Sequence, residues 1–146
     1  MSNDFPFALT HHIRDLCLCL HVQRAARALA RRFDEALRPV GLNQGQFSLL
    51  ISLNRPTPPT MGEVAALLAL DRTTLTANLK PLERRGLVKV KVDRDDKRSR
   101  RLTLTPAGRA LLVAAAPIWK RAHAHAERLL TRASPDILRA SLRELG

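Results

Sequence analysis

The sequence predicts a mainly α-helical fold with one small β-hairpin. Apolar residues recur every three or four positions through most of the chain, which is the spacing of one helix face. Only over residues 88–92 and 101–104 do apolar and polar residues alternate, as in strands with one buried face. A chain of 146 residues that is 45% hydrophobic is large enough for one domain with a modest core.

The first helix is predicted over about residues 9–38. Its apolar residues fall on one stripe: Ile13, Leu16, Leu20, Leu29, Phe33 and Leu37. Pro39 and Gly41 follow directly and would end the helix. We therefore expect one long helix at this end of the chain.

Two shorter helices are predicted next. Asn43 and Gln46 form a capping-box pair, which would start a helix that runs to about residue 53. The proline-rich segment 55–59 would separate it from the following helix. Thr60 and Glu63 form a second capping-box pair, which would start a short third helix.

A fourth helix is predicted to begin at Asp71, after a tight turn at residues 69–70, and to end at Gly86. Leu75, Leu79 and Leu82 share one face, which would pack on the domain. The remaining side is short, polar and basic: Arg72, Thr73, Thr74, Thr76, Ala77, Lys80 and Arg84. Threonine can contact base edges, and lysine and arginine can bind phosphates or guanine, although an ordinary solvated helix face has a similar composition.

The alternating segment predicts a hairpin with a charged loop. Val88, Val90 and Val92 would form one strand, residues 101–104 the returning strand, and residues 93–100 the loop. Nine basic residues lie between positions 84 and 101, and arginines on such a ribbon can enter a minor groove. The alternative is a solvated hairpin without a ligand. The loop residues predicted to bind DNA are Arg94, Lys97, Arg98 and Arg100.

Three carboxylates, those of Asp93, Asp95 and Asp96, lie among these basic residues. A carboxylate that pairs with a nearby arginine can fix the shape of the loop and leave the other arginines free. We expect Asp96 to have this role, paired with Arg94 or Arg98.

Two further helices would follow the hairpin, starting at Thr105-Pro106 and at Ser134-Pro135. Pro117 lies within the first of them, and Pro81 lies within the preceding basic helix. A proline cannot donate the helical hydrogen bond, so a kink is expected at Pro117, and a kink or a frayed second half at Pro81. Two helices joined by a tight turn and followed by a basic hairpin make a winged helix-turn-helix.

Charge and composition indicate which class of molecule the protein binds. Lys and Arg number 25 against 13 Asp and Glu, a net charge of +12, which favours nucleic acid first and an anionic membrane second. No apolar run approaches the roughly 20 residues that span a bilayer, and the segment 1–6 does not resemble a signal peptide, so we expect a cytoplasmic protein that binds no membrane. With only 3% aromatic residues and none in the basic segment, duplex DNA is favoured over single strands.

Two stretches resemble the MarR family. Leu82-Glu83-Arg84-Arg85-Gly86-Leu87-Val88 is similar to that family's recognition-helix end, and Asp93-Arg94-Asp95-Asp96-Lys97-Arg98-Ser99, followed by Leu102-Thr103-Leu104-Thr105-Pro106-Ala107-Gly108, is similar to its wing. The resemblance covers essentially the whole chain. It implies that Asp96 orients the wing and that Arg98 contacts DNA.

The resemblance also implies a domain plan and a function. Residues 1–146 would form one chain with a DNA-binding lobe over about 43–105 and dimerisation helices over about 9–38 and 106–146. The protein would be a homodimer that binds a palindromic operator, usually as a repressor, and that is released by a small aromatic or phenolic acid or by an oxidant. The sequence does not identify this effector.

The only two cysteines, Cys17 and Cys19, are two positions apart. An ungapped match through Gln46-Phe47 places Cys19 at the reactive cysteine of the organic-hydroperoxide-sensing, OhrR-like branch. That branch uses tyrosines beside its thiolate, whereas this chain has Phe33 and Gln44 at the matching positions. The histidines at positions 11, 12 and 21 are alternative activating groups. The thiols could instead be packing residues, or metal ligands together with these histidines.

Two other functions compete with a sequence-specific regulator. A thiol enzyme using Cys17 or Cys19 would need a nucleophile turn and an orienting group, which the sequence does not offer. A nonspecific architectural DNA-binding protein would have no preferred operator. We therefore expect no catalytic residue, no metal site and no cofactor.

Overall fold

The computed structural model describes residues 4–146, so Met1, Ser2 and Asn3 of the N-terminal segment lie outside the described residues. The elements are α1 (Phe7–Leu16), α2 (Leu18–Leu37), the short 3-10 helix η1 (Arg38–Val40), α3 (Gln44–Leu53), α4 (Met61–Leu68), α5 (Arg72–Arg84), β1 (Val88–Val92), β2 (Arg100–Leu104), α6 (Pro106–Arg128) and α7 (Pro135–Arg143). The expected mainly helical fold with one hairpin is confirmed. Within these residues no helix is both long and apolar enough to cross a bilayer.

The prediction of one helix over residues 9–38 was wrong. The helix breaks at Cys17, whose backbone is extended with φ −64° and ψ 108°. The Cys17 thiol accepts a hydrogen bond from the Leu20 N–H at 3.4 Å and so caps the start of α2. A side chain that caps a helix holds its own backbone outside the helix, which is why the chain turns here without glycine or proline.

Local capping signals set the other helix starts as predicted. Both capping boxes are present, Asn43 with Gln46 at the start of α3 and Thr60 with Glu63 at the start of α4. Thr105 caps α6. Between α4 and α5 the turn passes through Ala69, which adopts the left-handed conformation with φ 53°.

The core lies in the lobe formed by α3, α4, α5 and the hairpin. Leu50 of α3, Leu75 and Leu82 of α5 and Leu102 of β2 are fully buried there. Leu37 at the end of α2 belongs to the same cluster, so the lobe is packed directly onto the long helix. This packing holds the polar side of α5 facing outward.

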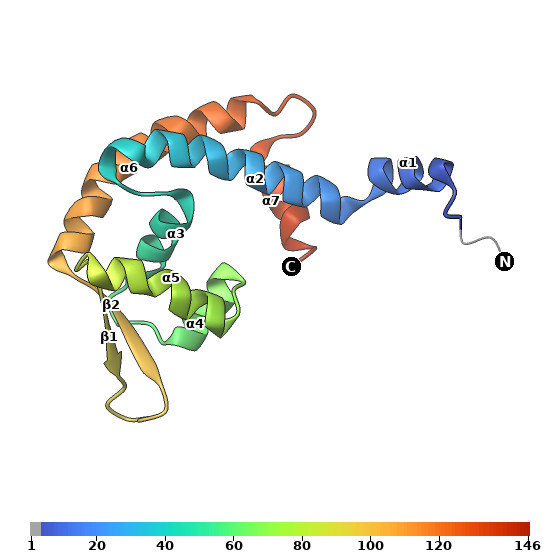
Figure 1. The fold of residues 1–146 in the computed structure, drawn as a ribbon. Helices are drawn as coiled ribbons and strands as arrows, with labels where there is room; N and C mark the ends of the chain where they lie inside the picture. The colour runs from blue at the N-terminus through green and yellow to red at the C-terminus, as the bar shows by residue number, and fades with distance from the viewer. Residues whose placement is uncertain (1–3) are drawn as a thin grey trace.

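Two long helices carry the lobe. Figure 1 shows α2 and α6 side by side, with the lobe below them, the hairpin projecting away from α2, and α1 extending beyond the body of the molecule. Figure 1 also shows that α6 bends along its length, in keeping with the kink expected from Pro117. Trp119 of α6 packs near Phe33 of α2 and Phe47 of α3, with ring centroids 6.4 and 6.1 Å away.

The hairpin is antiparallel, with Val88 opposite Leu104 and Val92 opposite Arg100. The chain enters β1 through Gly86 in the left-handed region, with φ 70°. It leaves β2 into α6 past Gly108, where a Cβ atom would lie 2.3 Å from the Leu87 carbonyl oxygen. Only glycine lets α6 approach the start of β1 this closely.

Candidate nucleic-acid interface

Helix α5 presents the polar face that the sequence predicts. Leu75, Leu79 and Leu82 are buried, which fixes the rotation of the helix about its axis. Six of the predicted DNA-binding residues are exposed on the rest of the helix: Arg72, Thr73, Thr76, Ala77, Lys80 and Arg84. This surface has an arginine at the helix start, short side chains at Thr73, Thr76 and Ala77, and basic side chains at Lys80 and Arg84.

Thr74, the seventh predicted residue of this face, forms hydrogen bonds within the first turn of the helix. Its hydroxyl donates to the Asp71 carboxylate at 3.0 Å, and its N–H donates to the same carboxylate at 2.7 Å. The Thr74 N–H and then the Thr74 hydroxyl hold the pKa of Asp71 below its ordinary value. Thr74 therefore acts in capping, and its hydroxyl is less available than those of Thr73 and Thr76.

The frayed second half expected after Pro81 is not observed. Helix α5 continues to Arg84, and the Arg85 N–H donates to the Pro81 carbonyl at 3.1 Å. Pro81 is half-buried, and its neighbour Leu82 is fully buried. Tertiary packing of this turn outweighs the loss of one helical hydrogen bond.

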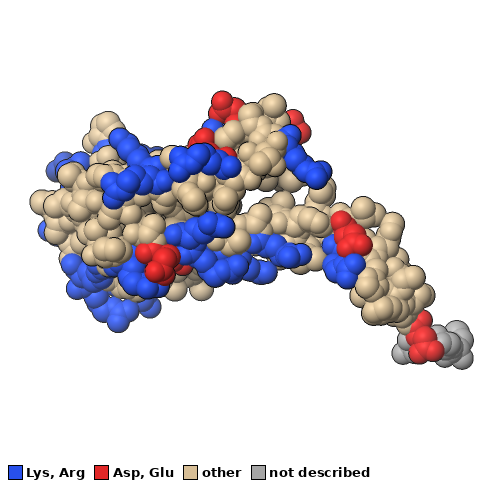
Figure 2. All heavy atoms as spheres, turned by 90° about the horizontal axis from the view of Figure 1, so that it is seen from above, with Lys and Arg blue, Asp and Glu red and all other residues tan. Residues whose placement is uncertain are grey.

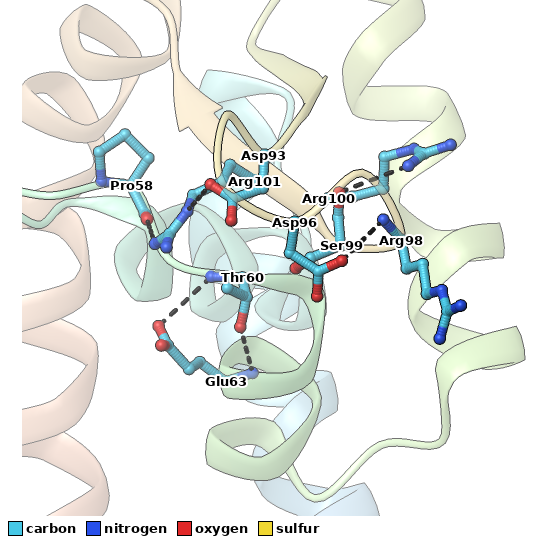
Figure 3. Close-up of polar contacts among 9 residues, drawn as sticks. All are labelled: Pro58, Thr60, Glu63, Asp93, Asp96, Arg98, Ser99, Arg100 and Arg101. Atoms are coloured by element: carbon cyan, nitrogen blue, oxygen red, sulfur yellow. Dashed lines mark hydrogen bonds and ion pairs between the residues drawn. The ribbon is translucent and has the colours of Figure 1, made fainter.

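The base of the wing is held by Arg101. Its Nε donates to Asp93 Oδ1 at 3.0 Å, and its Nη1 donates to the Pro58 carbonyl at 2.7 Å (Figure 3). The backbone of Arg101 also forms an isolated β-bridge with Thr60. The Arg101 hydrogen bond, with a smaller effect of its charge, lowers the pKa of Asp93. Residue 100, expected in the loop, belongs to β2, so the loop spans residues 93–99. One side chain thus connects both sides of this loop to the segment between α3 and α4.

Asp96 does not pair with Arg94 or Arg98 as expected. Its Oδ1 accepts the backbone N–H of Arg98 at 3.0 Å, and its carbonyl accepts the N–H of Ser99 at 3.0 Å (Figure 3). Asp96 therefore shapes the turn at the wing tip, whereas the wing's ion pair is formed by Asp93. A short side chain closes this turn more readily onto a nearby N–H than onto a long, solvated guanidinium.

The basic side chains of the wing tip are exposed. Arg94, Lys97 and Arg98 point into solvent, and within residues 4–146 none of these three side chains has a hydrogen-bond or ion-pair partner. Arg100 differs, because its guanidinium donates to the carbonyls of Lys97 and Ser99 at 3.2 and 3.4 Å. Arg98 is therefore free to contact a phosphate or a groove, while Arg100 partly supports the turn.

Sequence reasoning missed Arg101, the residue that ties the hairpin to the segment before α4. The alternation of β2 places it on the face opposite Leu102, but its contact with Pro58 joins residues 43 positions apart. The sequence carries no local signal for that contact. The acidic residue at position 93, directly after β1, is the one local hint of an ion pair across the hairpin.

The predicted cysteine site is only partly assembled. Cys17 is half-buried and caps α2, whereas Cys19 is exposed and its thiol accepts from Gln23 Nε2 at 3.4 Å. His21 Nδ1 lies 2.7 Å from the Cys17 carbonyl oxygen, so this ring contacts the main chain. Across the described chain, no three His, Cys, Asp or Glu side chains are grouped as a metal site.

Comparison with known proteins decides the family. The MarR family model matches residues 40–99, which cover α3 to the wing. The crystal structure of the transcriptional regulator MosR of M. tuberculosis, in complex with DNA, is 39% identical with a TM-score of 0.80, and the match covers 88% of this chain and 92% of MosR. This chain belongs to the MarR family.

Other MarR-type relatives agree with this assignment. The repressor CouR of Rhodococcus jostii RHA1, bound to a 23-mer DNA duplex, is 30% identical with a TM-score of 0.78 over 99% of both chains. The uncharacterized HTH-type transcriptional regulator YwoH of Bacillus subtilis is 33% identical over 58% of this chain and 61% of its own length. The MarR-family chain spans about half the length of the curated relatives it matches. These relatives make it a winged-helix protein of a family of transcriptional regulators.

Proposed function

We propose that this MarR-family protein is a dimeric transcriptional regulator that binds a palindromic operator, with α5 in the major groove and the wing in the minor groove. The observation that carries this proposal is the free, exposed Arg98 on a wing fixed by Arg101, beside the exposed face of α5. A groove-binding arginine contributes most when its backbone is already held in place. The DNA-bound MosR and CouR structures support this use of the fold.

Each side chain has a proposed contact. Thr73, Thr76 and Ala77 would touch base edges, because short side chains let the helix approach the groove floor. Cations would bind phosphates or guanines: Arg72, Lys80 and Arg84 from α5, and Arg94, Lys97, Arg98 and Arg100 from the wing. Asp96 would orient the tip by closing its turn. Phosphate contacts of this kind fix the register on the duplex, and the base contacts give specificity.

A homodimer would supply the second half of the operator contact. Helix α1 has no buried residue, and Phe7, Ile13 and Leu16 are 75%, 49% and 62% exposed. Ile137 of α7 is also 61% exposed. Apolar surface of this extent on both ends of the chain is typical of a surface that another copy covers. We therefore propose residues 9–38 and 106–146 as dimerisation segments and residues 43–105 as the DNA-binding lobe.

Regulation would be repression that an effector relieves. CouR is named a transcriptional repressor, which supports this direction. An oxidant is one candidate signal, because the Cys19 thiol is exposed. A hydroperoxide would oxidise this thiol to a sulfenic acid and would itself be reduced to the alcohol. A small organic acid is the other candidate.

The test is selection of bound sequences from a random duplex pool with the full-length protein. A palindrome with half-sites about one helical turn apart is expected. Recovery of no preferred sequence would instead favour a nonspecific architectural DNA-binding protein. Turnover of a peroxide or thioester that depends on Cys17 or Cys19, without operator binding, would favour the thiol enzyme.

A further inference from the structure

The chain passes between the two long helices and the lobe at two crossings. The first crossing is the segment 38–43, which leads from α2 through η1 into α3, and the second is Thr105, which joins β2 to α6. Both crossings form hydrogen bonds with the turn 85–87 that follows α5. The end of α5 is therefore the place where the lobe meets both long helices.

The crossing at Thr105 is buried. The Thr105 hydroxyl donates to the Gly86 carbonyl at 2.6 Å, and the Thr105 N–H donates to the Leu87 carbonyl at 3.1 Å. The same hydroxyl accepts the Gly108 N–H at 3.0 Å. Thr105 and Leu87 are 7% and 6% exposed, so water has little access to these hydrogen bonds. Buried hydrogen bonds thus fix this side of the turn.

Arg85 connects the other side of the turn to the first crossing. Its Nη1 donates to the Gly41 carbonyl at 2.8 Å, a contact between residues 44 positions apart. Its Nη2 would lie 3.3 Å from a Cβ atom at position 41, so the guanidinium lies close against this glycine. Gly41 adopts the left-handed conformation with φ 70°, which directs the chain from η1 into α3. Arg85 therefore binds the lobe to the chain at the point where it leaves α2.

This contact stands out in a chain with a large excess of cations. Figure 2, which looks down on the side of the molecule that carries α2 and α6, shows Lys and Arg side chains gathered there with few Asp and Glu among them. The Arg85 side chain is also exposed, but its guanidinium is bound to a main-chain carbonyl of a distant segment. A charged donor makes a stronger hydrogen bond to a carbonyl than a neutral donor does. Arg85 is thus placed to hold the lobe rather than to attract DNA.

We propose that Arg85 is a positioning residue that sets the angle of α5 relative to α2, and thereby the half-site spacing that the dimer accepts. The buried leucines of α5 fix its rotation within the lobe, whereas the Arg85 hydrogen bond is made to the chain that continues α2. In a dimer joined through the long helices, a tilt of each lobe changes the separation of the two α5 helices. The operator half-sites must match that separation. This inference rests on the proposed function, because it needs two copies of the chain on one operator.

The experiment uses the full-length protein and palindromic duplexes built from the sequence that a random pool yields, with one or two base pairs added or removed between the half-sites. Each base pair turns one half-site by about 34° relative to the other. The unmodified protein should lose at least about tenfold in affinity at each step, because the base contacts of one half-site are misplaced. Arg85→Gln should lose about threefold or less, because a less constrained lobe can tilt to follow the half-site. Arg85→Lys, which keeps a charged donor, should recover most of the preference.

A measurement without DNA reports the contact itself. In hydrogen–deuterium exchange, the amides of residues 38–43 should exchange roughly three- to tenfold faster in Arg85→Gln, as expected for the loss of one hydrogen bond. The matched control is Arg55→Gln, which removes the same charge from an exposed arginine of the lobe that pairs with Glu63 at 3.7 Å. This control should keep both the exchange rates of residues 38–43 and the spacing preference of the unmodified protein.

Three results would overturn the inference. One is unchanged exchange of residues 38–43 in Arg85→Gln. Another is an Arg85→Gln protein that binds the operator with a spacing preference as sharp as that of the unmodified protein. The third is a salt dependence of binding whose slope falls by about one in Arg85→Gln, which would mark a lost phosphate contact. Selection of no operator by the unmodified protein would contradict the proposed function and the spacing role with it, whereas a selected operator with unchanged spacing preference would contradict the spacing role alone.

Discussion

The guanidinium of Arg101 lies 3.0 Å from the Asp93 carboxylate, across the two ends of the wing loop. The same guanidinium donates to the Pro58 carbonyl, so the hairpin is tied to the segment that precedes α4. At the tip of the wing, Asp96 closes the turn by accepting hydrogen bonds from the backbone N–H groups of Arg98 and Ser99. The wing is thus stiff at its base and carries free cations at its tip.

Replacing Arg98 with alanine is expected to weaken operator binding more than about tenfold while the fold stays intact. The side chain is exposed and has no partner in the described chain, so the folded state loses little. Fluorescence anisotropy at physiological salt would measure the affinity, and circular dichroism the fold. Arg132→Ala, an exposed arginine beyond α6, is the control. An unchanged affinity for Arg98→Ala would refute the wing assignment.

Stability should depend on pH through Asp93. Its pKa is lowered in the folded protein, chiefly by the Arg101 hydrogen bond, so the ion pair stabilises the fold above the ordinary aspartate pKa of about 3.9. This contribution is lost as the pH falls through the lowered pKa. The stability difference between the unmodified protein and Asp93→Asn should be constant near neutrality and shrink below about pH 4. Urea unfolding at several pH values measures it, and a difference that stays constant down to pH 3 would contradict the assignment.

Gly108→Ala should destabilise the protein by about 1–3 kcal/mol, because its Cβ would lie against the Leu87 backbone and the Leu104 side chain. Gly62→Ala is a matched control in α4, where the nearest atoms to a new Cβ are 3.9 Å away. This control should be neutral or stabilising by up to about 1 kcal/mol. Urea unfolding gives both values, and equal stability of the two variants would argue against close packing at Gly108.

Thr73→Ala should change which operator sequences are preferred more than it changes overall affinity. The side chain is exposed near the start of α5, and a threonine contributes both a hydroxyl and a methyl group to base contacts. Selection from a random duplex pool would show altered preference at one position in each half-site. Thr57→Ala, in an exposed loop, is the control. A uniform loss of affinity across sequences would speak against base contact by Thr73.

Cys19→Ser should abolish any release of DNA by cumene hydroperoxide, since the serine hydroxyl is not oxidised under these conditions. Cys17→Ser is an informative companion, because serine can replace the thiol as the cap of α2. Anisotropy with and without peroxide measures release. A Cys19→Ser protein that still releases DNA on oxidation would exclude Cys19 as the sensor.

Structural features could be predicted from the sequence where all the residues that form them lie within one helical turn of each other. The caps at Asn43 and Thr60 each involve residues three apart, and both are present. It fails at Cys17, because neither glycine nor proline marks the break and a thiol is an uncommon cap. The Arg101–Pro58 contact also could not be predicted, because it depends on how the hairpin packs against a loop distant in sequence. The exposed face of α5 could be predicted because three buried leucines fix its rotation.

The aromatic cluster around Trp119 gives the protein an optical reporter of its own. Trp119 is the only tryptophan, and the chain has no tyrosine. Its ring stacks on His123 at 4.5 Å and lies near Phe33 and Phe47, where α2, α3 and α6 meet. Any movement of the lobe relative to the long helices changes the surroundings of this single fluorophore. Its emission can therefore follow such movement in the unlabelled protein.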